Sequence, residues 1–126
     1  MKRVMVVDGH AGIRELLVEL LAAEPGLEVV ASAATGVGAI ELADRLEPDV
    51  IVVDPEPAEV HGPDATRQIL AQHPRTCVLV LTAAPHGTLA AQTLAAGAQT
   101  CLAKSVAYTA IVEAIRAIRP LPRARS

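Results

Sequence analysis

Four side chains suited to phosphate and cation chemistry each stand at the end of an apolar run. They are Asp8 after VMVV, Asp54 after VIVV, Thr82 after VLVL and Lys104 after CLA. Carboxylate oxygens are ligands that Mg2+ prefers, and a lysine ammonium is a point charge for phosphate. An aspartate can also accept a phosphoryl group covalently. If the fold brings the four together, they form a site for a divalent cation and a phosphoryl group.

The elements that carry these residues alternate along the chain. Continuous β-branched runs indicate strands buried on both faces, and therefore a parallel sheet covered by helices. Between the first two runs, five apolar residues have the spacing of an amphipathic helix: Ile13, Leu16, Leu17, Leu20 and Leu21. The expected strands are 4–7, 27–33, 50–53, 78–81 and 100–103, and the expected helices are 13–21, 37–46, 64–72, 88–95 and 108–118.

This alternation predicts an α/β fold, a flavodoxin-like (βα)5 doubly wound parallel sheet with strand order 2-1-3-4-5. Ligands of such sheets bind beyond the carboxyl ends of the strands. Strands 1, 3, 4 and 5 would lie side by side, so Asp8, Asp54, Thr82 and Lys104 would share one rim. We expect a single domain over residues 1–119, followed by a linker or tail over 120–126.

Composition narrows the function classes. The 126 residues are 52% hydrophobic with a net charge of −3, and no apolar run is long enough to cross a membrane. The chain shows no secretory signal, so Cys77 and Cys101 are expected to be reduced thiols of a cytoplasmic protein. The sequence lacks the broad basic surface that would predict direct contact with nucleic acid. It also lacks the glycine-rich pattern that would predict a nucleotide site.

Five motifs in order, VMVVDGH, PDVIVVD, GPDATRQIL, VLVLTA and AAGAQTCLAKS, make the chain resemble the receiver domain of two-component response regulators over residues 2–119. Its DATRQIL and AGAQTCLAKS stretches are similar to receivers that precede a LuxR/NarL-type helix-turn-helix. The resemblance implies a phosphoprotein of a phosphorelay that regulates transcription, with a histidine kinase as partner. It implies no enzymatic activity beyond self-phosphorylation and self-dephosphorylation.

The resemblance also assigns roles to single residues. Asp54 matches the phosphoacceptor, Thr82 the switch hydroxyl and Lys104 the lysine that neutralises the phosphoryl group. Asp8 matches the first member of an acidic pair. Mg2+ would be held by Asp8, Asp54 and Glu56, the last through its main-chain carbonyl.

The chain departs from the family pattern around this site. Gly9 replaces the second acid of the pair, which should weaken Mg2+ binding; the Glu56 carboxylate could turn toward the gap or be an ordinary solvated side chain. The loop after Asp54 carries Pro55 and Pro57, which fix φ and remove two N–H donors. Cys101 stands where many receivers have a mobile aromatic, and we expect it to be a small buried thiol.

Histidines and the last helix raise further possibilities. His10, His61 and His86 are expected on the same rim, where three imidazoles could bind a transition metal, although ordinary loop histidines account for them more simply. On the last helix, a Val112, Arg116 and Arg119 edge is available for a homodimer. Any DNA-binding domain would lie C-terminal to the receiver, outside this chain.

Two functions remain open. The first is a receiver that accepts a phosphoryl group on Asp54 and switches its output by conformational change. The second is a pseudo-receiver that serves as a phosphorylation-independent dimerisation or docking module, which Gly9, Cys101 and the proline-bearing loop favour. A cofactor-binding or metabolic role on the same fold is a third, for which the sequence offers no motif.

Overall fold

Strands and helices alternate in this computed structural model, which describes residues 1–120. The expected tail, 120–126, therefore lies outside the described residues except for Pro120. The strands are β1 (Lys2–Val7), β2 (Leu27–Ala33), β3 (Val50–Val53), β4 (Cys77–Thr82) and β5 (Thr100–Ala103). The helices are α1 (Ala11–Ala22), α2 (Gly36–Leu46), α3 (Gly62–Gln72), α4 (Thr88–Ala95) and α5 (Tyr108–Ala117), with a short 3-10 turn, η1 (Ala58–Val60), that the sequence did not predict.

The sheet is parallel throughout and has the order β2-β1-β3-β4-β5, which confirms the predicted fold. Its register decides what lies at the rim. Val7 at the end of β1 pairs with Val53 at the end of β3. Thr82 at the end of β4 pairs with Ala103 at the end of β5. The residues that follow these strands therefore come out on the same edge of the sheet.

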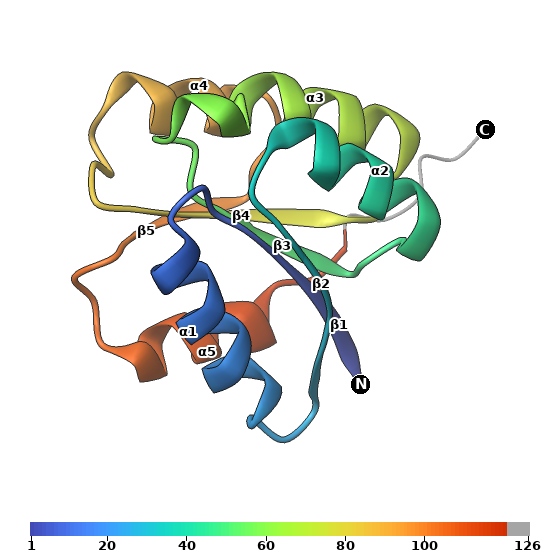
Figure 1. Ribbon diagram of the computed structural model, residues 1–126, viewed down its shortest axis with the longest axis vertical. Helices are drawn as coiled ribbons and strands as arrows, with labels where there is room; N and C mark the ends of the chain where they lie inside the picture. Colours follow the sequence, from blue (N-terminus) through green and yellow to red (C-terminus); the bar gives the residue numbers. More distant parts are fainter. Residues whose placement is uncertain (121–126) are drawn as a thin grey trace.

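The sheet lies between two layers of helices (Figure 1). Helices α1 and α5 cover one face, and α2, α3 and α4 cover the other. Because successive side chains of a strand point to opposite faces, β1 sends Val4 and Val6 into the core under α1 and α5 and Met5 and Val7 into the core under the other helices. This double burial explains why the strands are continuous apolar runs.

Two basic residues at the start of β1 bind the ends of helices on opposite faces. The Lys2 ammonium donates to the carbonyl oxygens of Ile115 and Ile118, at 2.9 and 2.7 Å, at the end of α5. The Arg3 guanidinium donates to the carbonyls of Leu46 and Glu47 at the end of α2. Helix C-terminal carbonyls lack partners within the helix, so these contacts fix both helices against β1.

Helix α1 forms where expected, but the sheet covers only part of its apolar surface. Leu17 and Leu21 are buried, whereas Ile13, Leu16 and Leu20 keep 39%, 54% and 38% of their surface exposed. An amphipathic helix buries one stripe of residues along its length, and apolar residues at the margins of that stripe are only partly covered. The sequence spacing predicted the helix, and the structure shows that only part of its apolar stripe is buried.

Helix α5 requires one correction. Ile111, Ile115 and Ile118 are buried as expected, but Val112, which the sequence placed on an available edge, is also buried at 4% exposure. It packs in the core between α5 and the sheet. Arg116 on the same edge donates to a Glu24 carboxylate oxygen at 3.3 Å. Over residues 1–120, no helix has both the length and the apolar character needed to cross a membrane.

Candidate functional site

Two buried carboxylates form the floor of the site. Asp8 and Asp54 are only 1% and 3% exposed, each directly after the end of its strand. The Asp8 N–H donates to the carbonyl of Ala33 at 3.1 Å, and the Asp54 N–H donates to that of Val7 at 2.9 Å. The sheet ladder thus continues into both residues, and it fixes the backbone from which each carboxylate projects.

The Lys104 ammonium lies between the two carboxylates. Its Nζ is 2.9 Å from Asp8 Oδ2 and also donates to Asp54 Oδ2. Burial alone would lower the pKa of Lys104, but its hydrogen bonds to Asp54 and Asp8 and the charges of both outweigh that effect, so the pKa lies above its usual range. The lysine is therefore a fixed positive charge in contact with both acids.

Thr82 completes the set of strand ends and is fully buried. Its Oγ1 accepts a hydrogen bond from the Ala84 N–H at 3.1 Å, while its carbonyl accepts from the Lys104 N–H at 2.8 Å. The residue thus joins the start of the loop after β4 to the end of β5. All four strand-end residues predicted from the sequence share one rim.

Glu56 contributes its main chain to the site. Its N–H donates to Asp54 Oδ1 at 3.0 Å, so an amide dipole faces the carboxylate. The Glu56 side chain is exposed, and its Oε1 lies 3.6 Å from where a Cβ on Gly87 would be. The carboxylate thus points toward the loop before α4, which matches the solvated side chain rather than a replacement for the missing acid.

Residue 9, where the family pattern has a second acid, packs against the loop after β3. A Cβ added at Gly9 would lie 2.6 Å from Pro57 Cβ and 3.0 Å from Pro57 Cγ. These distances are too short for unstrained contact, and a proline ring has little freedom to move aside. The contact therefore links Gly9 and Pro57, which in the sequence are two separate differences from the family pattern.

The side chains of two residues other than the four strand ends contact Asp8: His10, which the sequence placed on this rim, and Arg14, which it did not single out. The Arg14 guanidinium, in the first turns of α1, donates to the Asp8 carbonyl at 2.7 Å. The His10 N–H donates to Asp8 Oδ1 at 2.8 Å, and its ring Nδ1 lies 3.1 Å from the same oxygen. The spacing from Asp8 to Arg14 is a signal that sequence analysis could have used, because a long side chain in the first turn of the helix can reach back to the strand end.

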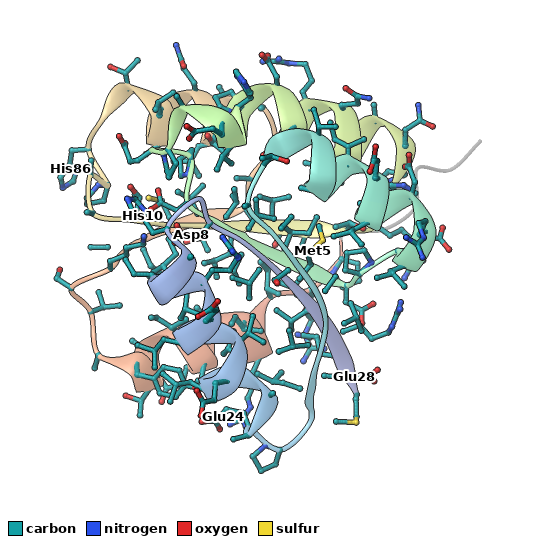
Figure 2. The ribbon with its side chains drawn as sticks, viewed as in Figure 1. Met5, Asp8, His10, Glu24, Glu28 and His86 are labelled. Carbon is teal, nitrogen blue, oxygen red and sulfur yellow. The ribbon has the colours of Figure 1, made fainter. Side chains whose placement is uncertain are left out.

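The donor set fits a divalent cation. One ligand atom from each of Asp8, His10 and Asp54 lies within 4.8 Å of the others. Two buried carboxylates that already hold the Lys104 ammonium form a pocket selective for positive charge. Among the described residues, His61 and His86 do not join this group. Figure 2 shows His10 beside Asp8, with His86 farther out on the same side of the molecule.

The two thiols differ in their surroundings. Both are free; Cys77 is buried, and Cys101 is partly exposed rather than buried as predicted. Cys101 Sγ lies 3.9 Å from the Pro85 carbonyl, so the loop after β4 covers it. Burial raises the pKa of both thiols above the usual cysteine value.

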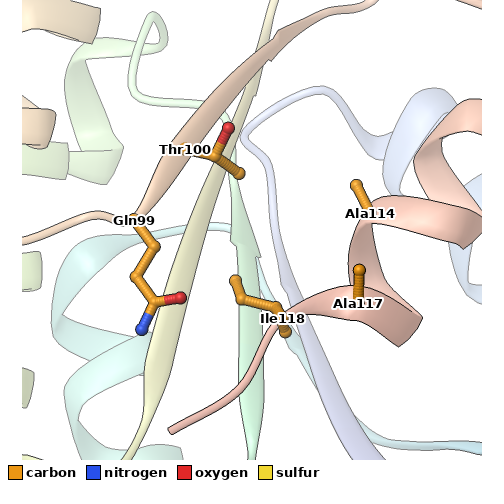
Figure 3. Close-up of a pocket in the computed structure, with 5 residues that line it drawn as sticks. All are labelled: Gln99, Thr100, Ala114, Ala117 and Ile118. Atoms are coloured by element: carbon orange, nitrogen blue, oxygen red, sulfur yellow. The ribbon is translucent and has the colours of Figure 1, made fainter. Parts of the chain in front are cut away.

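A separate hollow lies between β5 and α5 (Figure 3). It is open to solvent, has a volume of about 290 Å3 and is lined by Gln99, Thr100, Ala114, Ala117 and Ile118. Gln99 and Thr100 stand at the start of β5, the opposite end of the strand from Lys104. No titratable side chain lines the hollow, so it adds nothing to the chemistry of the acidic site.

The sequence of this chain is similar to those of known proteins over most of its length. Residues 4–116 match the family model of the response regulator receiver domain. The chain is 34% identical over 116 residues to the transcriptional regulatory protein DegU of Brevibacillus brevis, covering 92% of this chain and 49% of that protein. It is 40% identical over 117 residues to protein-glutamate methylesterase/protein-glutamine glutaminase 2 of Anaeromyxobacter dehalogenans, covering 93% and 34%.

A solved structure has a similar fold. The two-component response regulator of the LuxR family from Aurantimonas sp. SI85-9A1 superposes with a TM-score of 0.81 at 33% identity, covering 91% of this chain and 82% of that one. The chain spans half or less of the length of the two curated relatives above.

Proposed function

This chain belongs to the family of response regulator receiver domains, and we propose that it accepts a phosphoryl group on Asp54 from a partner histidine kinase. One observation carries the proposal. The Asp54 carboxylate is buried and receives a hydrogen bond from the Lys104 ammonium on one oxygen and from the Glu56 N–H on the other. A nucleophile held between a fixed cation and an amide dipole is placed to become an acyl phosphate.

The transfer balances without a further reactant. An Asp54 oxygen forms a bond to phosphorus while the phosphorus–nitrogen bond to the kinase histidine breaks, and the leaving imidazole keeps the electron pair and takes up a proton. Lys104 is in place to neutralise charge on the phosphoryl oxygens. A divalent cation at Asp8, Asp54 and the Glu56 carbonyl would screen the negative charges of acceptor and donor. Any catalysis by the chain is limited to its own phosphorylation and dephosphorylation.

Switching would start at the β4 end of the site. A phosphoryl group on Asp54 offers new acceptors to the Lys104 ammonium and the Thr82 hydroxyl, which in this structure bind the acids and the Ala84 N–H. Turning Thr82 would release Ala84 and shift the loop before α4 between two pre-existing arrangements. Cys101 has no aromatic ring that could move inward. The conformational change would therefore occur in the loop between β4 and α4.

Transcription regulation is the output that the relatives support. DegU is named a transcriptional regulatory protein, and the matched Aurantimonas structure is of the LuxR family. We propose a DNA-binding domain C-terminal to this receiver and a cytoplasmic site of action with the kinase. A homodimer through α5 would have to use exposed residues such as Thr109, Glu113 and Ala117, because Val112 is buried.

The pseudo-receiver is the second candidate, and the contact between Gly9 and Pro57 favours it. That contact closes the space where the family places a second carboxylate. In this alternative the same fold would dock or dimerise without phosphorylation.

Intact-mass spectrometry after incubation with acetyl phosphate separates the two. We expect the wild type to gain one phosphoryl group only when Mg2+ or another divalent cation is present, and Asp54→Asn to gain none. Asp64→Asn is the matched control, because the Asp64 side chain is 82% exposed at the start of α3, and it should label like the wild type. If the wild type gains no phosphoryl group with any divalent cation, the proposed phosphorylation is wrong and the docking module is the remaining candidate.

A further inference from the structure

We propose that His10 is the third side-chain ligand of the cation site, and that it makes the site prefer a transition-metal ion such as Mn2+ or Co2+ over Mg2+. The inference rests on the proposed function, because it concerns the cation of the same phosphoryl site. It assigns to this chain a ligand that lies outside the acidic pair and its neighbouring main-chain carbonyl.

The geometry places an imidazole where a ligand is needed. Ligand atoms of Asp8, His10 and Asp54 lie within 4.8 Å of one another. Donors on one ion at about 2.1 Å each are about 3.0 Å apart when adjacent and about 4.2 Å apart when opposite, so the three side chains would have to draw closer to bind one ion. The separation of 3.1 Å between His10 Nδ1 and Asp8 Oδ1 already suits two adjacent ligands. The His10 N–H donates to Asp8 Oδ1, which keeps the ring next to that carboxylate.

The neighbouring position cannot supply the ligand in this structure. A side chain at residue 9 would meet Pro57 Cβ at 2.6 Å, so the loop after β3 fills the space that a carboxylate would need. One residue further along, the His10 side chain is 59% exposed and has room to turn. In this structure, therefore, a nitrogen donor at residue 10 can approach the Asp8 carboxylate, whereas an oxygen donor at residue 9 cannot.

A nitrogen donor changes which ion the site prefers. Mg2+ takes oxygen ligands and gives up its waters reluctantly, so it gains little from an imidazole. First-row transition ions bind imidazole well, and their affinity for a mixed nitrogen and oxygen site rises from Mn2+ to Co2+ and beyond. Mn2+ and Co2+ also accept six ligands, which leaves positions for water and a phosphoryl oxygen.

Pulsed electron paramagnetic resonance of Mn2+ bound to untagged protein tests the ligand directly. We expect nitrogen coupling from a bound imidazole in the wild type and in His86→Ala, and its loss in His10→Ala. Titrations of the same proteins should show Mn2+ affinity about tenfold lower in His10→Ala, with Mg2+ affinity changed less than about twofold. His86 is the matched control because it is a rim histidine outside the cation group.

The outcomes separate this inference from the proposed function. Absence of nitrogen coupling in the wild type, or equal Mn2+ affinity in the wild type and His10→Ala, overturns the His10 ligand whether or not Asp54 is phosphorylated. Because the His10 side chain is largely exposed, its removal should leave the fold intact, which circular dichroism of the variant checks. If the coupling is present but acetyl phosphate gives no adduct with Mn2+, Co2+ or Mg2+, phosphorylation fails and the cation site stands.

Discussion

The strand ends and the loops around Asp8 and Asp54 differ in how the chain fixes them. Asp8, Asp54, Thr82 and Lys104 lie at the ends of paired strands, and main-chain hydrogen bonds between neighbouring strands reach into all four. Gly9, His10, Glu56 and Pro57 lie in loops, where side-chain packing and local turns decide their positions. The strand ends carry all four residues proposed to form the phosphoryl site, and the loops beside them carry Gly9 in place of an acid and the two prolines. The sheet therefore fixes the proposed phosphoacceptor, whereas the loops determine which side chains lie next to it.

The sharpest way to break this comparison is to remove the charge that joins the strand ends. Lys104→Met leaves two carboxylates that are 1% and 3% exposed next to each other without a cation. Without divalent ions we expect the free energy of unfolding to fall by about 3 kcal/mol, because a buried charge pair loses its partner. Added Mn2+ should restore much of the loss, since it binds the same acids. Urea denaturation with and without the ion measures both effects.

Lys2→Met is the matched control for that experiment. Lys2 also donates to partly buried acceptors, the carbonyls at the end of α5, but it lies at the opposite end of β1. Its loss should destabilise the protein equally with and without Mn2+. If Mn2+ restores neither variant, or restores both equally, the acids do not form the cation site.

A smaller effect on stability is expected at the contact between the loop that contains Gly9 and the loop that contains Pro57. Gly9→Asp alone should lower stability by about 2 kcal/mol, because its Cβ would overlap Pro57. Pro57→Ala would leave a Cβ in the same place, so Pro57→Gly is the partner substitution. In the double variant the two changes should be less destabilising than their sum, by about 1 kcal/mol or more. Additive losses in denaturation experiments would mean that the contact is not shared.

The double variant also tests the cation site. With the space opened, the carboxylate introduced by Gly9→Asp would offer Mg2+ an oxygen ligand, and we expect Mg2+ affinity measured by calorimetry to rise above that of the wild type. Gly9→Ala with Pro57→Gly provides the same backbone changes without the carboxylate. Equal Mg2+ affinity in these two double variants would show that residue 9 does not face the ion.

At the end of β4 the expected effect is smaller again. Thr82→Val keeps the shape of a fully buried side chain but removes the acceptor for the Ala84 N–H. We expect a loss of about 1 kcal/mol, since Ala84 is partly exposed and its N–H can turn to water. Thr82→Ser retains the hydroxyl, and amide hydrogen exchange at Ala84 should stay slow in it and become faster in Thr82→Val. Equal exchange in both variants would argue against the contact.

The strand ends could be predicted because their causes are local. A run such as VIVV is typical of a strand buried on both faces of a sheet, and a parallel register brings Asp8 and Asp54 to one rim. The Mg2+ ligand roles came from the family resemblance and stay predictions. The structure adds that Lys104 contacts both Asp8 and Asp54.

The remaining contacts depend on residues far apart in sequence. Nothing near Gly9 indicates that Pro57 packs on it, because that contact depends on how two loops meet across the sheet edge. Lys2 and Arg3 belong to no motif in the sequence, yet they bind the ends of α5 and α2. Val112 was misplaced because helical spacing gives the width of a buried stripe only roughly, and the packing of α5 against the sheet decides its edge.

The smallest expected difference compares two thiols, one within the sheet and one under a loop. Cys77 begins β4 and is 2% exposed, whereas Cys101 in β5 is partly exposed beneath the loop at Pro85. Burial raises both pKa values, so alkylation of each should be slower at neutral pH than that of a free thiol and speed up as pH rises. Cys101 should react about tenfold faster, because a loop opens more readily than a sheet. Iodoacetamide labelling of Cys77→Ser and Cys101→Ser isolates each thiol. Equal rates would mean that the loop is held as firmly as the strands, and that the switch proposed for it starts elsewhere.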